Sequence, residues 1–220
     1  MTKILGIDES GRGPVIGSMV MCGVVIDESK ERELVNIGVK DSKLLLPKVR
    51  ELLYNKIEEI ADEIFVIIVN PKEIDDALEN PLLDLNKLEA LKTAEIILKS
   101  KADIAFLDCP SVNIASYKSE LQNLLGDSKI KLNLEHKADL NYPVVGAASI
   151  IAKVTRDRLI EEIKQKYNVD FGSGYPSDPK TITFLEKNWD NPKFSDIFRK
   201  SWDTWKRIKI NKSQMKLGGW

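Results

Sequence analysis

The stretch from Ile4 to Pro14 constrains the fold most, because an apolar run leads two adjacent carboxylates into a glycine-rich turn. Ile4 to Ile7 has the pattern of a short buried strand, and Asp8 and Glu9 follow directly. Successive side chains of a strand point to opposite faces, so Asp8 and Glu9 serve one site only if the strand ends or twists there. The glycines that follow make such an ending plausible, since they bring bare backbone close to a ligand. An isolated pair of acids at a strand end is more often simply solvated, so the rest of the chain has to decide.

Short apolar runs alternate with amphipathic segments along the remaining chain. The expected strands are 4–7, 18–26, 64–69, 104–107 and 131–134, and the expected helices are 31–36, 47–62, 86–100, 115–125 and 143–167, with short helices after residue 180. We expect the first two strands to pair as a hairpin. The small residues 146–149 should let the longest helix pack tightly against the sheet. The alternation predicts an α/β layered fold, whose ligand site lies outside the ends of its strands.

Composition fits one main globular domain in the cytoplasm. Hydrophobic residues make up 43% of the 220 residues and charged residues 30%, and we find no apolar run that could span a bilayer and no signal peptide. Cys22 and Cys109 lack metal-finger spacing, so we expect buried thiols. The net charge of −1 hides a basic C-terminal part, because residues 180–220 contain ten Lys and Arg against four Asp and Glu. Such a part is often only a solvated surface, but it can also contact phosphates.

Acidic side chains recur where the expected strands end. Asp108 follows the strand 104–107, as Asp8 and Glu9 follow the first strand, and Asp139 comes shortly before the long helix. Four acids in one cleft repel each other unless cations neutralise them. Oxygen ligands select hard ions such as Mg²⁺ or Mn²⁺, and two such ions about 4 Å apart can hydrolyse a phosphodiester without a protein nucleophile.

At this point the chain resembles a known family. DESGRGP, from Asp8 to Pro14, is similar to the DEAGRG signature of ribonuclease HII, with Ser10 in place of the usual alanine. Six further motifs follow in family order, and together they are highly specific: KDSK (40–43), LD (107–108), KAD (137–139), AASIIAK (147–153), GSGYP (172–176) and RKSW (199–202). The likeness extends to about residue 207, and its last motif resembles the archaeal branch of the family.

The resemblance implies a ribonuclease H-like mixed sheet flanked by helices, with a small C-terminal helical appendage. It implies an endoribonuclease that cleaves the RNA strand of RNA–DNA hybrids and single ribonucleotides embedded in duplex DNA. Cleavage would occur 5′ to the ribonucleotide by two-metal-ion hydrolysis with Mg²⁺ or Mn²⁺, leaving 3′-hydroxyl and 5′-phosphate ends. Asp8, Glu9, Asp108 and Asp139 match the catalytic, metal-binding carboxylates of the family.

Further residues match substrate-binding positions of the family. The turn Gly11-Arg12-Gly13 matches the backbone that senses the 2′-hydroxyl, the group that distinguishes RNA from DNA. Tyr175 matches the tyrosine that stacks on the deoxyribose after the ribonucleotide, and Lys43, Ser149 and Lys153 match residues that hold phosphates. From the residues alone, the glycines could merely close a turn, Tyr175 could fill the core, and Ser149 and Lys153 could lie on the surface.

Three other residues near the motifs receive no catalytic role. Asp41 is expected to fix its loop rather than bind metal, and His136 is expected to be structural or peripheral, because acid–base catalysis by histidine would normally need a partner. Cys109 stands where the family often has glycine, which leaves the local backbone geometry open.

The end of the chain suggests a protein partner. Gln214, Leu217 and Trp220 have the spacing of a box that binds the sliding clamp PCNA, although the second terminal aromatic is missing, and a frayed terminus is the alternative. We therefore divide the chain into a catalytic domain (1–180), a helical region packed on it (181–210) and a flexible tail (211–220). We expect a monomer without membrane contact.

Three other functions stay open at this stage. A non-catalytic module that binds nucleic acid or the clamp would tolerate loss of Asp108. The first strand also resembles the phosphate-binding strand of actin-like and sugar-kinase ATPases, but these need two such domains. A transposase or integrase core, another ribonuclease H-like phosphoryl-transfer enzyme, would use similar carboxylates without explaining the glycine turn and Tyr175.

Overall fold

The computed structural model describes residues 1–39 and 45–217, and it separates into two compact units. The first, here called the sheet unit, comprises Met1–Ser10, Val20–Ile68 and Leu85–Thr155. The second, here called the helical unit, comprises Gly11–Met19, Val69–Asp84 and Arg156–Trp220. Each unit is thus assembled from segments that are distant in sequence. The linear division at residues 180 and 210 stays a prediction.

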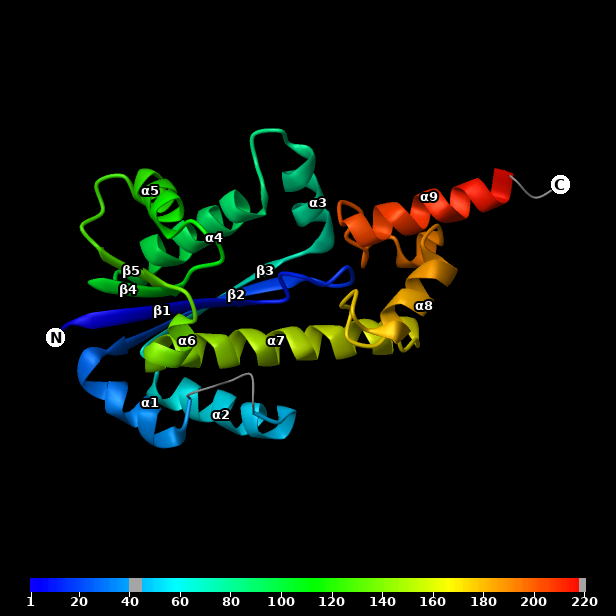
Figure 1. Cartoon of the computed structure of the whole chain (residues 1–220). Coiled ribbons are helices and arrows are strands. Elements are labelled where there is room, and N and C mark those ends of the chain that lie inside the picture. The colour runs from blue at the N-terminus through cyan, green and yellow to red at the C-terminus, as the bar shows by residue number, and fades with distance from the viewer. Residues whose placement is uncertain (40–44, 218–220) are drawn as a thin grey trace. The chain divides into compact units, whose positions relative to one another are not determined.

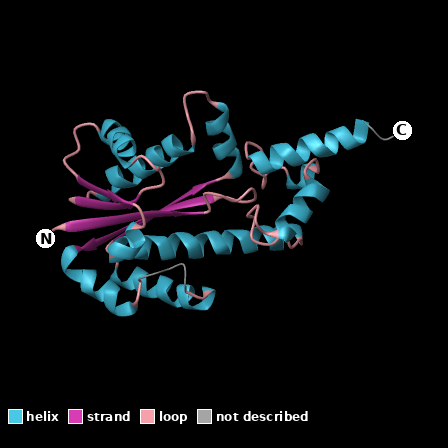
Figure 2. Ribbon diagram, viewed as in Figure 1, coloured by secondary structure: helices cyan, strands magenta, loops and turns pink. Residues whose placement is uncertain are grey.

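The sheet unit is built on a mixed five-stranded sheet within the described residues (Figure 2). Its strands lie in the order β3 (Glu63–Val69), β2 (Met19–Asp27), β1 (Lys3–Ser10), β4 (Ile104–Asp108) and β5 (Lys131–Glu135). β1 pairs antiparallel with β2 over its whole length, which confirms the hairpin, and it pairs parallel with β4. β4 in turn pairs parallel with β5. The carboxyl ends of β1, β4 and β5 therefore meet at one edge of the sheet.

Helices cover both faces of this sheet (Figure 1). α4 (Leu85–Ser100) and α5 (Ile114–Leu125) lie on one face, and the first part of α7 (Pro143–Tyr167) lies on the other with α1 (Glu31–Ile37) and α2 (Pro47–Ile60). The one-turn helix α6 (Ala138–Asn141) precedes α7, and the 3₁₀ turn η1 (Glu28–Lys30) precedes α1. The prediction of an α/β fold with a mixed sheet and flanking helices is confirmed.

Gly6 explains how closely α7 approaches the sheet. A Cβ atom on Gly6 would lie 2.3 Å from the carbonyl carbon and oxygen of Val144, in the first turn of α7. Gly146 makes a similar approach, because its Cβ would lie 2.8 Å from the carbonyl oxygen of Val39. The small residues at the start of α7 thus pack against the sheet unit as expected.

The helical unit contains α3 (Pro71–Glu79), α8 (Pro179–Asn188), η2 (Pro192–Phe194), α9 (Asp203–Leu217) and the part of α7 that follows Thr155. Asn70 and Asp178 start α3 and α8, because each side chain accepts a backbone N–H of the first turn and a proline follows each cap. The unit has its own core, which consists mainly of Val15, Ile16, Ile160, Phe171, Leu185, Phe194, Ile197, Phe198, Trp205 and Ile208. The aromatic residues of the C-terminal third therefore pack together within this unit, and the packing of region 181–210 on the catalytic domain stays a prediction.

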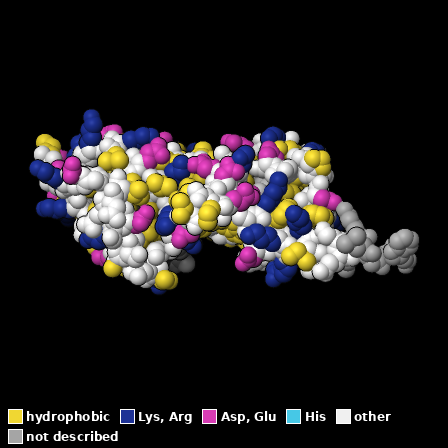
Figure 3. All heavy atoms as spheres, turned by 90° about the horizontal axis from the view of Figure 1, so that it is seen from above, with side chains coloured by type: hydrophobic (Ala, Val, Ile, Leu, Met, Phe, Trp, Pro, Cys, Tyr) yellow, Lys and Arg dark blue, Asp and Glu magenta, His cyan; other side chains and the backbone are white. Residues whose placement is uncertain are grey.

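The C-terminal part differs from the sequence expectation in one respect. α9 continues to Leu217, so a helix occupies most of the segment expected as a flexible tail. Basic side chains are visible over the segment that carries α8 and α9 (Figure 3). Among the helices in the described part of the chain, none has the length and apolar character needed to cross a membrane.

Candidate active site

Asp8 and Asp108 lie side by side at the carboxyl ends of two neighbouring parallel strands. The register of β1 and β4 pairs Ile7 with Leu107, so the two aspartates are the next residues on each strand. Asp8 is buried, with 5% of its surface exposed, and Asp108 is half-buried. The parallel pairing thus brings two predicted acids together at the edge where open α/β sheets bind ligands.

The surroundings of Asp8 make its charge costly. Burial raises the pKa of Asp8 to about 6; the positive charge of Lys153 and a hydrogen bond from Ser149 oppose this shift, and the charge of Asp108 adds to it. The Glu9 N–H also donates to Asp8 Oδ1 at 2.8 Å, which favours the charged form. A buried carboxylate beside another carboxylate is a typical environment for a cation-binding or catalytic acid.

Ser149 and Lys153 come from α7 and are one helical turn apart. Lys153 Nζ donates to Ser149 Oγ, and both groups act on Asp8. Ser149 is fully buried, so its alternative as a surface residue is wrong. Lys153 is half-buried.

Asp139 reaches the same edge of the sheet through α6. The chain leaves β5 at Glu135 and reverses at Lys137, whose φ of 59° lies in the left-handed region. The N–H of Ala138 then donates to Asp108 Oδ1 at 3.2 Å, and Asp139 follows with only 1% of its surface exposed. Segment 135–139 is therefore a tight connection that ties Asp139 to the end of β4.

Glu9 acts on the other side of β1. The strand does not end at Asp8: pairing with β2 continues to Ser10, so adjacent side chains alternate between the faces. The charge of Glu9, like that of Asp108, acts on Cys109, and it also acts on Tyr117 of α5, whereas Lys153 and Ser149 of α7 act on Asp8. Within residues 1–39 and 45–217, no three acidic, histidine or cysteine side chains converge closely enough to hold a metal ion. The expectation that the strand ends at Asp8 is thus not met, and the metal assignment of the four acids stays a prediction.

A fifth acid near this edge was missed by the sequence analysis. Glu89 of α4 is fully buried, and its charge raises the pKa of Cys109 and Tyr117, for both of which burial is the larger cause. Helical spacing could have indicated its burial, because Glu89 lies on the same helix face as the buried residues Thr93 and Ile96. The ring nitrogen Nδ1 of His136 lies 3.3 Å from the Cys109 carbonyl oxygen, in keeping with the structural role expected for it.

In the helical unit, the predicted recognition residues also come together. Gly11 has a φ of 82°, and a Cβ there would lie 2.6 Å from Cδ and Nε of Arg156. A Cβ on Gly13 would lie 3.7 Å from the ring of Tyr175, and the Arg156 guanidinium lies 4.9 Å from the centre of that ring. Arg156 is thus packed between the glycine turn and Tyr175, a role that no sequence pattern indicated.

The loop that carries Tyr175 is held by its neighbours. Val15 N–H donates to the Gly174 carbonyl at 2.9 Å, and Asp178 accepts the N–H and hydroxyl of Ser173 at 2.7 and 2.9 Å. These hydrogen bonds hold the pKa of Asp178 below its usual value. Tyr175 itself is half-buried, so it is not core filler, and its ring is partly available to a ligand.

The structure describes only some of the remaining predicted site residues. Arg12 is half-buried in the glycine turn, and Gln214 is exposed near the end of α9. The side chain of Leu217, together with Lys43 and Trp220, lies outside the described residues.

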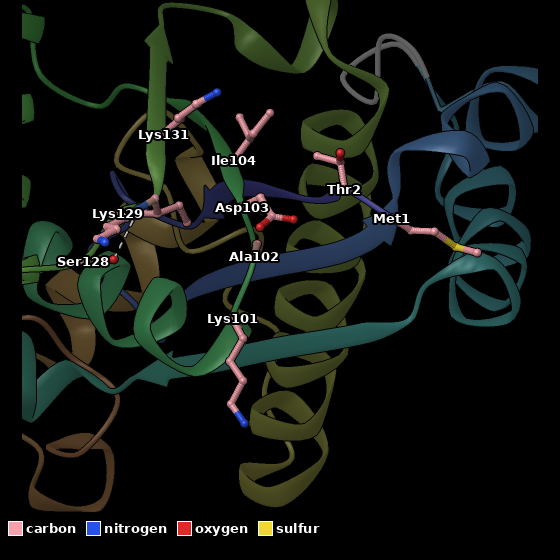
Figure 4. A pocket seen from close by; sticks show the side chains of 10 residues that line it. Met1, Thr2, Lys101, Ala102, Asp103, Ile104, Ser128, Lys129 and Lys131 are labelled. Carbon is pink, nitrogen blue, oxygen red and sulfur yellow. Dashed lines mark hydrogen bonds between the residues drawn. The ribbon is translucent and has the colours of Figure 1, made fainter.

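A cavity of about 690 Å³ lies at the opposite edge of the sheet. It is lined by residues at or just before the amino ends of β1, β4 and β5, including Lys101, Lys129 and Lys131. These three lysine side chains point away from one another in Figure 4, so they do not converge on one ligand. The acids at the carboxyl ends of the strands are therefore the better candidate for a reaction site.

Comparisons with known proteins show which family the chain resembles. The profile of the family described as Ribonuclease HII matches residues 5–205. The chain belongs to the ribonuclease HII family. It is 46% identical to ribonuclease HII of Pyrococcus furiosus, over 98% of this chain and 96% of that protein. Members of this family are metal-dependent hydrolases with ribonuclease H activity, which act on RNA–DNA hybrids.

Two solved structures of ribonucleases H2 or HII extend the likeness to three dimensions. The crystal structure of ribonuclease H2 from Pyrococcus horikoshii OT3 is 43% identical, with a TM-score of 0.87 over 97% of this chain and 100% of that one. A ribonuclease HII from Archaeoglobus fulgidus, solved in complex with PCNA, is 39% identical, with a TM-score of 0.82 over 93% and 94% of the two chains. The ribonuclease HII fold therefore extends over nearly the whole chain.

Proposed function

We propose that this ribonuclease HII is an endonuclease that cuts the RNA strand of RNA–DNA hybrids and single ribonucleotides embedded in duplex DNA. Cleavage is on the 5′ side of the ribonucleotide and leaves 3′-hydroxyl and 5′-phosphate ends. The observation that carries the proposal is the buried Asp8 beside Asp108 at the carboxyl edge of the sheet, hydrogen-bonded to Ser149 and within the influence of the Lys153 charge from α7. This arrangement combines charge for cation binding with groups that can hold a phosphate.

The donor set suits Mg²⁺ or Mn²⁺, because all four predicted ligands are carboxylates and hard ions prefer oxygen. Asp8, Glu9, Asp108 and Asp139 would hold the ions. A cation between Asp8 and Asp108 would favour the charged form of Asp8, whose pKa is raised by burial and, to a smaller degree, by the charge of Asp108. Glu9 joins the set only if its side chain rotates or β1 twists on binding. When bound, two such ions supply an activated water and stabilise the leaving oxygen of the phosphodiester.

Other residues of this chain bind the phosphate and recognise the sugars of the substrate. Lys153 and Ser149 hold and orient the phosphate next to the acids, since they already interact with Asp8. Gly11, Arg12 and Gly13 read the 2′-hydroxyl through their backbone, and Tyr175 stacks on the sugar that follows the ribonucleotide. The packing of Gly13 against Tyr175 supports this assignment, because both ends of the ribonucleotide-to-DNA junction would be read by one rigid group of residues. Lys43 is proposed as a further phosphate ligand on the basis of the family motif.

PCNA is the proposed protein partner. The exposed Gln214 on α9 and the residues Leu217 and Trp220 would form the binding segment, and the relative from Archaeoglobus fulgidus was solved with PCNA. The cytoplasmic location and monomeric state expected from the sequence also stay proposals.

The test is a cleavage assay on an end-labelled DNA duplex that carries one ribonucleotide. The protein is incubated with Mg²⁺, with Mn²⁺ or with EDTA, beside an all-DNA duplex of the same sequence. We expect one cut, 5′ to the ribonucleotide, with either metal and none with EDTA or on the all-DNA duplex. A folded sample that makes no cut with either metal, or that cuts all-DNA, contradicts the proposal.

A further inference from the structure

Arg199 binds the carbonyl side of the glycine turn. Its side chain is fully buried, and its guanidinium donates to the carbonyl oxygens of Gly11 at 2.6 Å, Arg12 at 2.9 Å and Gly17 at 2.9 Å. The indole Nε1 of Trp202 donates to the carbonyl oxygen of Gly13 at 3.1 Å. The three successive carbonyls of the turn are therefore all held by the segment 199–202.

These hydrogen bonds to the carbonyls determine the direction in which the backbone N–H groups of the turn point. In a trans peptide, the C=O of one residue and the N–H of the next point in opposite directions, and the described residues contain no cis peptide. The N–H groups of Arg12 and Gly13 are consequently directed away from Arg199, whereas Pro14 has no N–H to offer. Because hydrogen bonds to a charged donor polarise the peptide groups they join, the cation also strengthens these amides as donors.

Asp75 of α3 in turn fixes the segment that contains Arg199. Its carboxylate accepts the N–H of Lys200 at 2.8 Å and both the N–H and the hydroxyl of Ser201 at 2.9 and 2.5 Å. Asp75 is buried, with 9% of its surface exposed, so these bonds are shielded from water. A carboxylate that holds two consecutive amides permits little movement of the backbone next to Arg199.

We propose that Arg199 and Asp75 are positioning residues for ribonucleotide recognition. Asp75 holds the backbone after Arg199, Arg199 and Trp202 hold the carbonyls of Gly11 to Gly13, and the amides of Arg12 and Gly13 are thereby presented to the 2′-hydroxyl. This inference rests on the proposed function of the turn. It adds that discrimination between RNA and DNA depends on an aspartate in α3 that makes no substrate contact itself.

The test separates positioning from general stability. For each enzyme, KM is measured with a duplex that carries one ribonucleotide, and Ki is measured with the all-DNA duplex as a competitor. The first variant is Asp75→Asn, which weakens the hydrogen bonds from Lys200 and Ser201 to the side chain at position 75. The second is Arg199→Lys, which keeps the positive charge but loses the planar guanidinium that donates to several carbonyls at once. Asp76→Asn is the matched control, because Asp76 is exposed in the same helix and pairs with Lys72.

We expect Asp75→Asn to raise KM for the ribonucleotide duplex roughly tenfold, the scale of one lost hydrogen bond to a charged group, with Ki for all-DNA unchanged. Arg199→Lys should raise KM further, and Asp76→Asn should match the wild type. A variant that only unfolds part of the sample lowers kcat per total protein and leaves both KM and Ki as they were. That result for Asp75→Asn, or equal shifts of KM and Ki, overturns the inference.

Two controls keep the outcomes distinct. Thermal unfolding shows whether Arg199→Lys folds, and Asp75→Asn alone decides if it does not. Failure of the wild type to cut the ribonucleotide duplex refutes the proposed function, and this inference with it. Normal wild-type cleavage with an unchanged ratio of Ki to KM in Asp75→Asn refutes only the positioning role.

Discussion

Replacing Gly6 by alanine tests whether the approach of α7 to the sheet places the acids. The new Cβ would lie 2.3 Å from the carbonyl carbon and oxygen of Val144 and 2.5 Å from the nitrogen of Val145, all of them backbone atoms. Ordinary van der Waals contact begins at 3.4 Å, so β1 and α7 must separate locally by about an ångström. Gly6 does not have a positive φ, so the conformation itself accepts alanine and the effect is purely steric.

The expected loss of stability is large because backbone atoms, unlike side chains, cannot rotate away from the new Cβ. Overpacking a core typically costs about 1–3 kcal/mol, and we place Gly6→Ala at or above about 3 kcal/mol. For a chain of this length, that lowers the melting temperature by roughly 6–12 °C. Asp8 lies two residues beyond Gly6 and Ser149 one turn beyond Val145, so the separation also pulls their hydrogen bond apart. Cleavage per folded molecule should therefore fall as well.

Gly23→Ala is the matched control, from the neighbouring strand. A Cβ there would lie 2.4 Å from Cγ2 of Ile96 and 3.1 Å from Cδ1 of Leu5, both side-chain atoms that can shift. We expect a loss of about 1 kcal/mol and unchanged activity per folded molecule. Thermal unfolding followed by circular dichroism, together with cleavage rates below the transition, measures both effects. Equal destabilisation by the two substitutions would refute the reasoning.

Three further changes test the proposed roles. Asp108→Asn should reduce cleavage below detection and leave affinity for an RNA–DNA hybrid largely intact in a gel-shift titration; residual turnover near the wild-type rate would contradict a catalytic role. Tyr175→Ala should lose about ten- to a hundredfold more activity on a single embedded ribonucleotide than on a long hybrid, the scale of one lost stacking contact; equal losses argue against the junction role. A chain that ends at Asn211 should lose the calorimetric signal with PCNA that the full chain gives; equal signals, or none from either, would exclude clamp binding through the tail.

Much of the site could be predicted because it depends on local pattern. The apolar runs before Asp8 and Asp108 predict two strands, and parallel pairing of such strands places their ends together. The small residues at the start of α7 predicted tight packing, and Gly146 does approach the carbonyl oxygen of Val39 closely. These inferences needed only the periodicity of the chain and the geometry of an α/β sheet.

The position of Glu9 could not be predicted in the same way. Whether it joins Asp8 depends on where β1 ends, and the end is set by pairing with β2, which continues to the pair of Ser10 and Val20. Residues near the turn do not reveal that register, because glycines are compatible with both a strand end and a continued strand. The side of the sheet that Glu9 faces is thus a property of the partner strand.

The roles of Asp75, Arg156 and Arg199 could not be predicted from the sequence for a second reason. Asp75 contacts residues 125 and 126 positions away, and no periodicity connects a short polar helix to a distant loop. A buried arginine in a motif suggests importance, but its partners are backbone carbonyls, which every residue has. Only the three-dimensional structure identifies which carbonyls these are.

The bonds around the glycine turn also fix an order of events during synthesis. They join residues 187 to 189 positions apart, so the turn leaves the ribosome long before its partners exist. The acids of β1 and β4 can assemble once α7 has been made, but the amides of Arg12 and Gly13 are not oriented until Trp202 has emerged. Under the function proposed for the turn, the nascent chain therefore acquires the ability to distinguish a ribonucleotide only after its acids have assembled. A chain cut short before Arg199 would carry its acids without that restraint.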